Sequence, residues 1–285
     1  MRISKLMTQS ELAGDHITRN MLSCIENGSA NPSLSTVLYI ASRLGVPAGF
    51  LLAEAGDEIV YRKMSNLQNI KHAYTAGDLR GCRSLCVSAC PEPDDEISLL
   101  LSSCDVGIAK EEFWSGRLRS ACRFFDEAMS YAEKTVYPTE AEIAEAWVYF
   151  HYMERLSHTL YSDFLDEDAE MELISASPFA RYVRALDALD NGDDAAVQSY
   201  LEQSETADFF HEHIRIRSLM ENGDYTTSLS ALLHLLAKEE PLNKIELFTV
   251  LSELEICCRE NDDFKGAYNY ANEKIQLLEE LLKEY

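Results

Sequence analysis

The sequence predicts an all-α protein of two unequal parts, a small N-terminal group of short helices and a longer array of helical hairpins. Apolar residues recur three and four positions apart through most of the chain, which is the spacing of one helix face. A turn of the Gly-Asp type recurs beyond residue 56 at intervals typical of helical hairpins. Charge is also divided unevenly along the chain, which indicates two domains, at residues 1–55 and 56–285.

The composition is that of an ordinary globular protein. The chain has 285 residues, 46% of them hydrophobic and 26% charged, which is enough to bury a sizeable core. It has neither the roughly 18 consecutive apolar residues of a membrane span nor the apolar segment of a signal peptide. We therefore expect a soluble, cytoplasmic protein with no membrane partner. Eight cysteines spread along so long a chain predict reduced thiols and no disulfides.

The acidic charge lies outside the N-terminal part. The whole chain has a formal net charge of -24, yet four basic residues balance four acidic residues over residues 1–56. The remaining 21 basic and 45 acidic residues place all of the net charge in the longer part. Since such a body repels phosphate, any contact with nucleic acid must come from the N-terminal part.

Two short helices with clear start and stop signals are expected at residues 8–26. Thr8 caps the first, and Glu11 three positions later completes a capping box. Thr18 caps the second, which ends at Asn27-Gly28 because both residues tolerate the left-handed conformation. Its apolar residues face inward, and its outward face consists of Arg19, Asn20, Ser23 and Cys24.

A third helix is expected to begin at Ser33 or Ser35 and to close at Gly45. Pro47 starts a short last helix. The predicted apolar face of the third helix contains Leu34, Val37, Leu38, Ala41 and Leu44.

These segments resemble the phage-repressor-like (XRE-type) helix-turn-helix family. The resemblance lies in "TQSELA", "ITRNMLSCIENG", "NPSLSTVLYIASRLGV" and "FLL", and it covers about residues 6–53. It implies that residues 18–26 form a recognition helix in the major groove of an operator in double-stranded DNA. Asn pairs with adenine and Arg with guanine, as such a helix requires. Carried over by position, the base-reading candidates are Thr18, Arg19, Asn20 and Ser23, and the phosphate-binding candidates are Gln9 and Asn27.

The family's first helix is expected to be mostly missing from this chain. It would precede "TQSELA", where only Met1 to Met7 are available, too few for a stable helix. The helix that would support the recognition helix is therefore predicted to be incomplete.

Beyond residue 56 a turn sequence recurs five times. We count it from Gly77, Gly116, Gly192, Gly223 and Asn261, with intervals of 39, 76, 31 and 38 residues. The long interval indicates a unit between Gly116 and Gly192 that lacks its turn signature. Most units have a small residue five positions after the turn, where the two helices of a hairpin can approach closely. A larger residue follows nine positions after the turn and is expected to fill the space between hairpins.

The units resemble degenerate tetratricopeptide repeats, over about residues 60–285. The resemblance implies an all-α superhelical solenoid with a concave face that takes a peptide or protein segment. The last stretch, 264–285, is expected to cap the stack through an apolar stripe of Ala267, Ala271, Ile275, Leu278, Leu281 and Leu282.

Four arginines place positive charge in this otherwise acidic part of the chain. Arg181 and Arg184 lie on one expected helix, and Arg215 and Arg217 lie on another. Facing a groove, they would hold a peptide carboxylate or acidic side chains. The alternative is ordinary surface pairing, for example of Arg184 with Asp187.

Cysteine clusters elsewhere in the sequence are interpreted as structural. Cys82, Cys86 and Cys90 fall four apart, which suits a soft metal or an oxidation sensor. Two of them also occupy core positions of the repeat, and buried cysteine is common, so we favour a core role. Cys257 and Cys258 point in different directions on a helix.

Histidines give no metal site either. His151 and His158 lack the close pairing of zinc-binding histidines, and His211 and His213 lie on divergent faces. There is also no phosphate loop and no nucleophile elbow. We therefore expect no metal, no cofactor and no enzymatic activity.

Together the two parts resemble the Rgg-like, peptide-responsive transcription regulators of Gram-positive bacteria. The resemblance implies a homodimer on a pseudo-palindromic operator, with half-sites about one helical turn apart and a short peptide as the effector. The alternative hypothesis is a protein-interaction adaptor with a vestigial helix-turn-helix.

Overall fold

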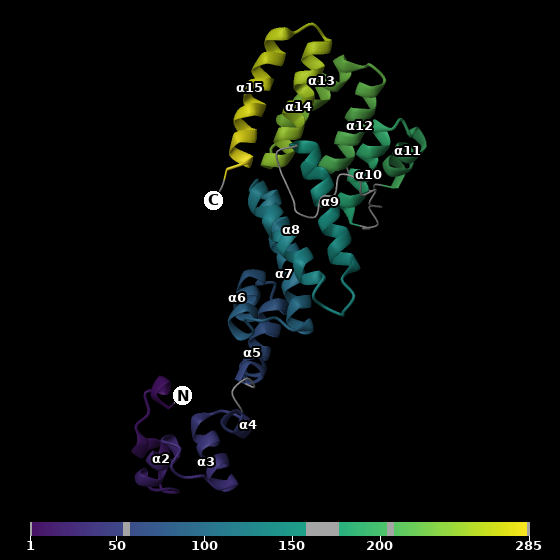
Figure 1. The fold of residues 1–285 in the computed structure, drawn as a ribbon. Coiled ribbons are helices and arrows are strands. Elements are labelled where there is room, and N and C mark those ends of the chain that lie inside the picture. The colour runs from purple at the N-terminus through teal and green to yellow at the C-terminus, as the bar shows by residue number, and fades with distance from the viewer. Residues whose placement is uncertain (1, 54–57, 158–176, 204–207, 284–285) are drawn as a thin grey trace.

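The computed structural model describes residues 2–53, 58–157, 177–203 and 208–283. Over these ranges the protein is all-helical, with fifteen α-helices, one short 3-10 helix and no strand. Figure 1 shows the first helices as a separate group at one end of the molecule and the last hairpin at the other. The predicted fold class is confirmed. None of the described helices is long and apolar enough to cross a membrane.

The N-terminal group consists of a 3-10 turn and four short helices. They are η1 (Ile3–Lys5), α1 (Gln9–Ala13), α2 (Arg19–Glu26), α3 (Leu34–Leu44) and α4 (Ala48–Leu52). The predicted caps are confirmed, including the capping box between Thr8 and Glu11 and the cap of α3 by Ser33. Gly28 and Gly45 adopt the positive φ that ends α2 and α3.

The predicted apolar face of α3 is partly wrong. Leu34 and Leu38 are exposed, whereas Ile40 is buried with Leu44 against Leu12 and Leu22. The physical reason is that α3 packs on α1 and α2 through a stripe turned away from its first leucines, and spacing alone does not fix the direction of that stripe.

The rest of the chain folds into consecutive helical hairpins. The hairpins pair α5 (Glu58–Thr75) with α6 (Leu79–Ala89), α7 (Asp95–Trp114) with α8 (Leu118–Ala132), α10 (Pro178–Asp190) with α11 (Asp194–Gln203), α12 (Phe209–Glu221) with α13 (Tyr225–Leu236), and α14 (Lys244–Glu260) with α15 (Phe264–Leu281). Helix α9 (Glu140–Leu156) stands between the second and third pairs. The region of the missing turn signature, 158–176, lies outside the described residues.

Each hairpin turns on one residue with positive φ. Four of these are the predicted glycines, with φ between 70° and 78°. In the last hairpin the residue is Asp262, with φ 62°, and not Asn261, which has φ -92°. The last interval is therefore again 39 residues, and Ala267 rather than Gly266 takes the small core position five residues later.

The residue after the turn usually caps the next helix. The Asp78, Asp224 and Asp263 carboxylates each accept a hydrogen bond from a backbone N–H three residues on. Gly-Asp is thus a pair with two tasks, a left-handed residue followed by an N-cap.

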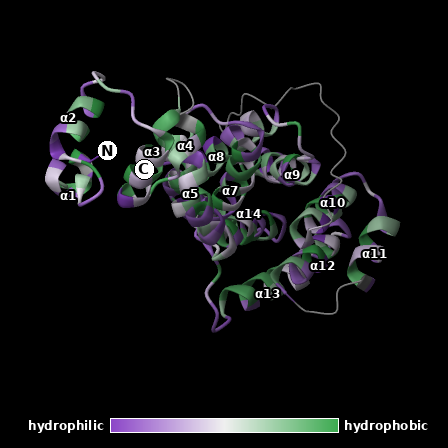
Figure 2. Ribbon diagram, turned by 90° about the horizontal axis from the view of Figure 1, so that it is seen from below, coloured by the Kyte–Doolittle hydropathy of each residue, from purple (hydrophilic) through white to green (hydrophobic). Residues whose placement is uncertain are grey.

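The last hairpin of the array contacts the second hairpin. A buried cluster of aromatic rings from α7, α9 and α10 includes Phe113, Tyr149 and Phe179. Tyr152 of α9 lies 3.1 Å from the Thr249 hydroxyl of α14, and α7 and α14 lie side by side in Figure 2. The second hairpin, α9 and the last hairpin are therefore packed together at this point.

The apolar stripe predicted for helix α15 is only partly buried. Ala267, Leu277 and Leu281 are buried, but Ile275 is exposed. The Arg119 guanidinium of α8 donates a hydrogen bond to the Leu282 carbonyl at 2.8 Å, so the end of α15 is fixed to the second hairpin. Helix α15 packs on α14 and on the second hairpin through a face that is rotated relative to the predicted apolar face. Some residues of the predicted stripe are therefore buried and others are exposed.

Candidate nucleic-acid interface

Helix α2 begins in the manner predicted for a recognition helix. The Thr18 hydroxyl accepts a hydrogen bond from the Met21 N–H at 3.1 Å, which satisfies one of the free donors at the start of α2. Leu22 is buried among residues of α1 and α3, with Ile25 packed beside it. The helix is therefore held from one side only, and its opposite side is open to solvent.

The four candidate base-reading residues lie together at the start of α2. Thr18, Arg19 and Asn20 are exposed, and Ser23 is half-buried. Side chains at positions 19, 20 and 23 of one helix share a face because three or four residues make one turn. Arginine, asparagine and hydroxyl groups offer donors and acceptors that match base edges in a major groove.

Both candidate phosphate-binding residues lie at the C-terminal end of this helix. Asn27 is exposed and forms the C-cap of α2, with its N–H bonded to the Ser23 carbonyl. Gln9 is half-buried, and its amide donates to the Glu26 carboxylate at 2.7 Å. The Gln9 side chain is therefore engaged with the end of the recognition helix in this structure.

Arg2 joins the same contact. Its guanidinium donates to both Glu26 oxygens, at 2.6 Å and 3.1 Å. The Arg2 hydrogen bond, followed by that of Gln9, lowers the pKa of the Glu26 carboxyl. This pairing offsets a negative charge that would otherwise stand beside the expected DNA surface.

The segment before α1 is held by hydrogen bonds to other parts of the N-terminal group. It forms only the turn η1, as the sequence predicted, yet Lys5 donates to the Leu44 carbonyl at the end of α3. Arg43 of α3 donates to the Glu11 carbonyl, and the Tyr39 hydroxyl donates to the Ala13 carbonyl at 3.1 Å. Sequence reasoning missed this bracing, although two basic residues in the first five positions were a signal for it.

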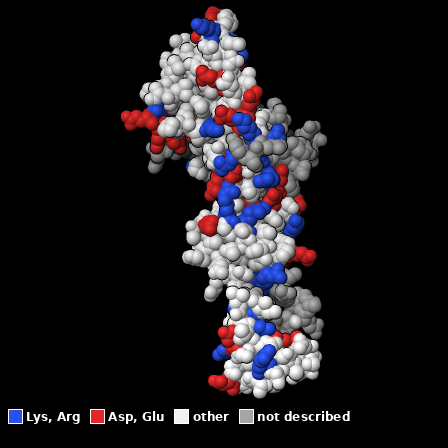
Figure 3. Space-filling model, turned by 90° about the vertical axis from the view of Figure 1, so that its left-hand side faces the viewer, with Lys and Arg blue, Asp and Glu red and all other residues white. Residues whose placement is uncertain are grey.

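Charge differs between the N-terminal group and the middle of the molecule. Figure 3 shows mixed signs on the N-terminal group and a band of Lys and Arg across the middle of the molecule, accompanied by acidic residues. In that region Arg83 pairs with Asp105 at 2.6 Å and Arg117 with Glu112 at 2.5 Å. Because these arginines pair within the protein, they do not form a free basic surface for DNA.

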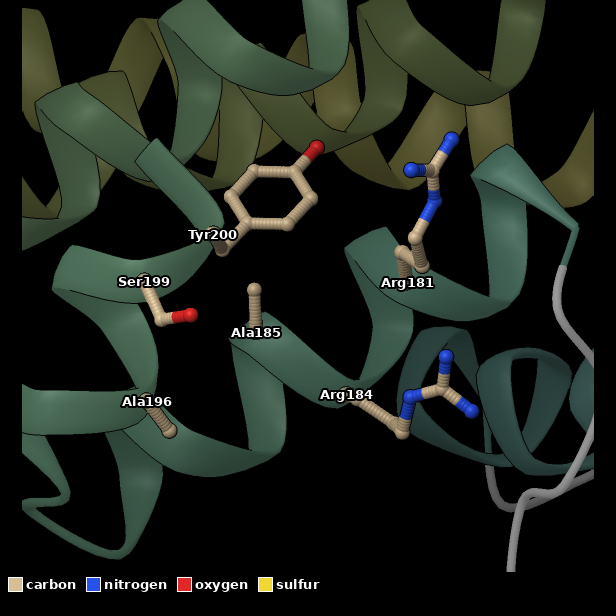
Figure 4. Close-up of a pocket in the computed structure, with 6 residues that line it drawn as sticks. All are labelled: Arg181, Arg184, Ala185, Ala196, Ser199 and Tyr200. Atoms are coloured by element: carbon tan, nitrogen blue, oxygen red, sulfur yellow. The ribbon is translucent and has the colours of Figure 1, made fainter. Parts of the chain in front are cut away.

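The four candidate arginines of the longer part are not brought into one groove. Arg181 and Arg184 of α10 line a pocket of about 290 Å³ with Ser199 and Tyr200 of α11. Figure 4 shows the two guanidinium groups on α10 opposite these hydroxyl groups. Arg215 is exposed elsewhere, on α12. The pocket lies between the two helices of one hairpin.

The pocket contains strong hydrogen-bond donors. Burial, reinforced by Asp208, raises the pKa of Tyr200 to about 12, against the opposing effect of Arg181. The Tyr200 hydroxyl therefore keeps its proton at neutral pH. Two guanidinium groups and two hydroxyls suit the recognition of a carboxylate.

Arg217 belongs to a separate ion network. It lies 3.1 Å from Asp190, 3.2 Å from Glu221 and 3.6 Å from Glu253. Arg217 therefore combines one partner on its own helix, Glu221, with partners on two neighbouring helices. Asp187, suggested as a partner of Arg184, pairs with Arg155 of α9.

A buried polar chain adjoins that network, and sequence reasoning missed it. His213 lies 2.9 Å from the Tyr182 hydroxyl through Nδ1 and 2.7 Å from Glu253 through Nε2. Since a carboxylate only accepts, Nε2 carries the proton and Nδ1 accepts from Tyr182. The partners come from three helices, so no local spacing in the sequence signals this chain.

The clustered cysteines are core residues. Cys82, Cys86 and Cys90 are all buried with Cys104, and burial raises the pKa of Cys86 to about 12. Thiols of this kind are poor nucleophiles and poor ligands. In the described part of the chain no group of three His, Cys, Asp or Glu residues is placed to hold a metal ion. His158 lies outside the described residues.

Comparison with known proteins identifies the N-terminal group. A family model described as helix-turn-helix matches residues 1–51, which form η1 to α4. The match indicates a DNA-binding regulator. No curated protein and no solved structure matches the chain.

Proposed function

We propose that this chain is a DNA-binding transcription regulator with a reader at residues 1–55 and a sensor and dimerisation domain at 56–285. The observation that carries the proposal is the helix-turn-helix match over residues 1–51, together with the open face of α2 that presents Arg19 and Asn20. The acidic remainder of the chain supports the same division, since it has no net attraction for phosphate.

In this proposal the start of α2 enters the major groove. Arg19 donates to guanine and Asn20 pairs with adenine, while Thr18 and Ser23 contact adjacent base edges. Asn27 and Gln9 contact phosphates near the end of α2, and Gln9 exchanges its hydrogen bond with Glu26 for one with the backbone of the DNA.

A mobility-shift experiment tests the reader. A duplex is first selected from a random pool with the wild-type chain, and Arg19→Ala and Asn20→Ala are then titrated against it. We expect each variant to lose about 1–3 kcal/mol of binding free energy. Arg259→Ala, which removes an exposed arginine 3.4 Å from Glu260, is the control and should bind as the wild type does.

Two results would contradict the assignment of the reader. Unchanged binding by both α2 variants would show that α2 does not read bases. Failure of the wild-type chain to bind any duplex would favour the adaptor with a vestigial helix-turn-helix.

We propose further that the hairpins are tetratricopeptide-like and serve an Rgg-like sensing role in the cytoplasm. The pocket between α10 and α11 is the candidate ligand site, because Arg181 and Arg184 oppose Ser199 and Tyr200 there. Its chemistry suits the carboxylate of a peptide terminus or of an acidic side chain. Arg215 and Arg217 lie outside that pocket and have no role in this site.

Fluorescence anisotropy with a pool of labelled peptides that end in a free carboxylate tests the sensor. We expect Arg181→Ala and Arg184→Ala each to weaken binding, and amidation of the peptide terminus to weaken it similarly. Arg215→Ala is the matched control. Equal binding by all three variants would contradict the site.

A further inference from the structure

Tyr200 of the pocket between α10 and α11 is contacted by His211, a residue of α12 that does not itself line the pocket. The His211 imidazole lies 3.1 Å from the Leu201 carbonyl through Nε2. Since a carbonyl oxygen only accepts, Nε2 carries the proton and donates it to this bond. The rings of Tyr200 and His211 are also stacked, with centroids 6.5 Å apart and planes 28° apart. One side chain therefore contacts both the backbone and the ring at the end of α11.

The bond to Leu201 satisfies a group that α11 leaves open. Helix α11 ends at Gln203, so the Leu201 carbonyl is one of the last four and has no N–H partner within the helix. The His211 imidazole supplies a donor from the next helix. Because Tyr200 directly precedes Leu201, this bond also limits the movement of the Tyr200 backbone.

His211 itself projects from a helix that is fixed at its start. The Asp208 carboxylate caps α12 and accepts a hydrogen bond from the His211 backbone N–H at 2.9 Å. Two residues further on, buried His213 lies 2.9 Å from Tyr182 of α10 and 2.7 Å from Glu253 of α14. The position of the His211 side chain is therefore set by bonds to two other helices.

Arg181 lies across the pocket from Tyr200. Figure 4 shows the Tyr200 hydroxyl and the Arg181 guanidinium toward the same end of the pocket, with the Arg184 guanidinium farther from that hydroxyl. Arg181 also acts on the ionisation of Tyr200, since it opposes the rise in the pKa of Tyr200 that burial and Asp208 cause. A guanidinium and a protonated hydroxyl placed in this way can donate to the same carboxylate.

We propose that His211 is a positioning residue of the ligand site, which holds the Tyr200 hydroxyl where it and Arg181 bind one carboxylate together. His211 makes no contact with the ligand. Without His211 the Tyr200 side chain is less ordered before binding, and ordering it then costs part of the binding free energy. This inference rests on the ligand site of the proposed function and adds the residue that arranges that site.

Fluorescence anisotropy with two forms of one labelled peptide tests the role of His211. The peptide is the tightest binder in the pool used for the sensor, prepared with a free and with an amidated C-terminus. The ratio of the two dissociation constants reports on the carboxylate contact. We expect amidation to weaken binding about tenfold in the wild-type chain and only about twofold in His211→Ala.

Two further variants distinguish positioning from a general loss of structure. His211→Gln retains an N–H donor that can reach the Leu201 carbonyl, and it should restore most of the wild-type ratio. His234→Ala removes an exposed histidine of α13 and is the matched control, so it should keep the wild-type ratio. All these variants should keep the helical circular dichroism spectrum of the wild-type chain.

A double variant identifies the group through which His211 acts. Tyr200→Phe removes the hydroxyl and should weaken binding of the free-acid peptide about fivefold, as His211→Ala does. The double variant should also lose only about fivefold, because the hydroxyl that His211 positions is already absent. A loss of about 25-fold, the product of two independent effects, would overturn the positioning role.

The remaining outcomes separate this inference from the proposed ligand site. If Arg181→Ala lowers the ratio and His211→Ala leaves it at the wild-type value, the positioning role is overturned and the ligand site stands. If the wild-type chain binds both forms of the peptide equally, the ligand site is wrong and the inference fails with it. Failure of His211→Gln to restore the ratio would overturn the role of the bond to Leu201.

Discussion

The N-terminal group and the hairpin array are stabilised in different ways. In the N-terminal group a small core around Leu12 and Leu22 is supplemented by side chains that bond to backbone carbonyls, such as Lys5 to Leu44 and Tyr39 to Ala13. In the array, stacked aromatic rings such as Phe113 and those of α9 and α10 form one large core. Stability and DNA recognition are therefore assigned to different parts of one chain.

This contrast has a practical consequence for variants. Changes in the aromatic core should affect unfolding of the array without altering the recognition surface, and changes in the small core should do the reverse. Variants that act on one part alone test that separation.

Phe179→Ala should cause the largest loss. Phe179 is buried and contacts the rings of Phe113, Tyr149 and Tyr182, so truncation leaves a cavity at the centre of the array. We expect the free energy of unfolding of the array to fall by about 3–5 kcal/mol, measured by urea denaturation. Val136→Ala, at an exposed position, should change it by less than about 0.5 kcal/mol.

Leu22→Ala tests the other side of the comparison. Leu22 is the most buried residue of α2, and its loss should destabilise the N-terminal group by about 2–5 kcal/mol. DNA binding should fall with it, whereas the urea midpoint of the array should not move. A single transition that shifts as a whole would contradict the separation of the two parts.

The two parts should respond to acid with opposite sign. Burial raises the pKa of Asp105 to about 6 although Arg83 opposes the shift, so the folded array binds this proton more tightly than the unfolded chain does. Stability of the array is therefore lost as the pH rises from about 4 to about 6. The pKa of Glu26 is lowered, so its contribution is present above its ordinary value of 4.5 and lost as the pH falls.

Asp105→Asn isolates the first of these effects. Urea midpoints at pH 4 and pH 7 should show that the wild-type array loses about 1–3 kcal/mol more than the variant over this range. The same pH dependence in both proteins would show that Asp105 is not the group responsible.

The hairpin turns should give the smallest effects, with opposite signs. Asp262→Gly relieves a left-handed backbone that disfavours a side chain and should stabilise the array by about 0.5–1 kcal/mol. Gly223→Ala adds a side chain at φ 78°, with no atom within 4 Å to clash, and should destabilise it by about 1–2 kcal/mol. Thermal midpoints of the two variants should move apart.

Local features were predictable from the sequence because local chemistry determines them. The caps by Thr8, Thr18 and Ser33 and the turns at the four glycines depend on residues within one helical turn of each other. Features that join distant segments were not predictable. The bond of Arg2 to Glu26 and the contact of α9 with α14 depend on how helices pack, which periodicity does not encode.

The candidate site was predictable to a similar degree. The open face of α2 follows from the position of Leu22 and Ile25 on the opposite side of the same helix. The engagement of Gln9 with Glu26 and the separation of Arg217 from Arg181 depend instead on partners from other helices. Those partners are chosen by three-dimensional packing and leave no spacing in the sequence.

Selection of duplexes from a random pool tests the central claim most directly, because it asks whether the N-terminal group reads sequence. The wild-type chain should enrich a defined motif, and Arg19→Ala and Asn20→Ala should lose or alter the preference at separate base positions. Enrichment of no motif by the wild-type chain, or of an identical motif by both variants, would contradict it.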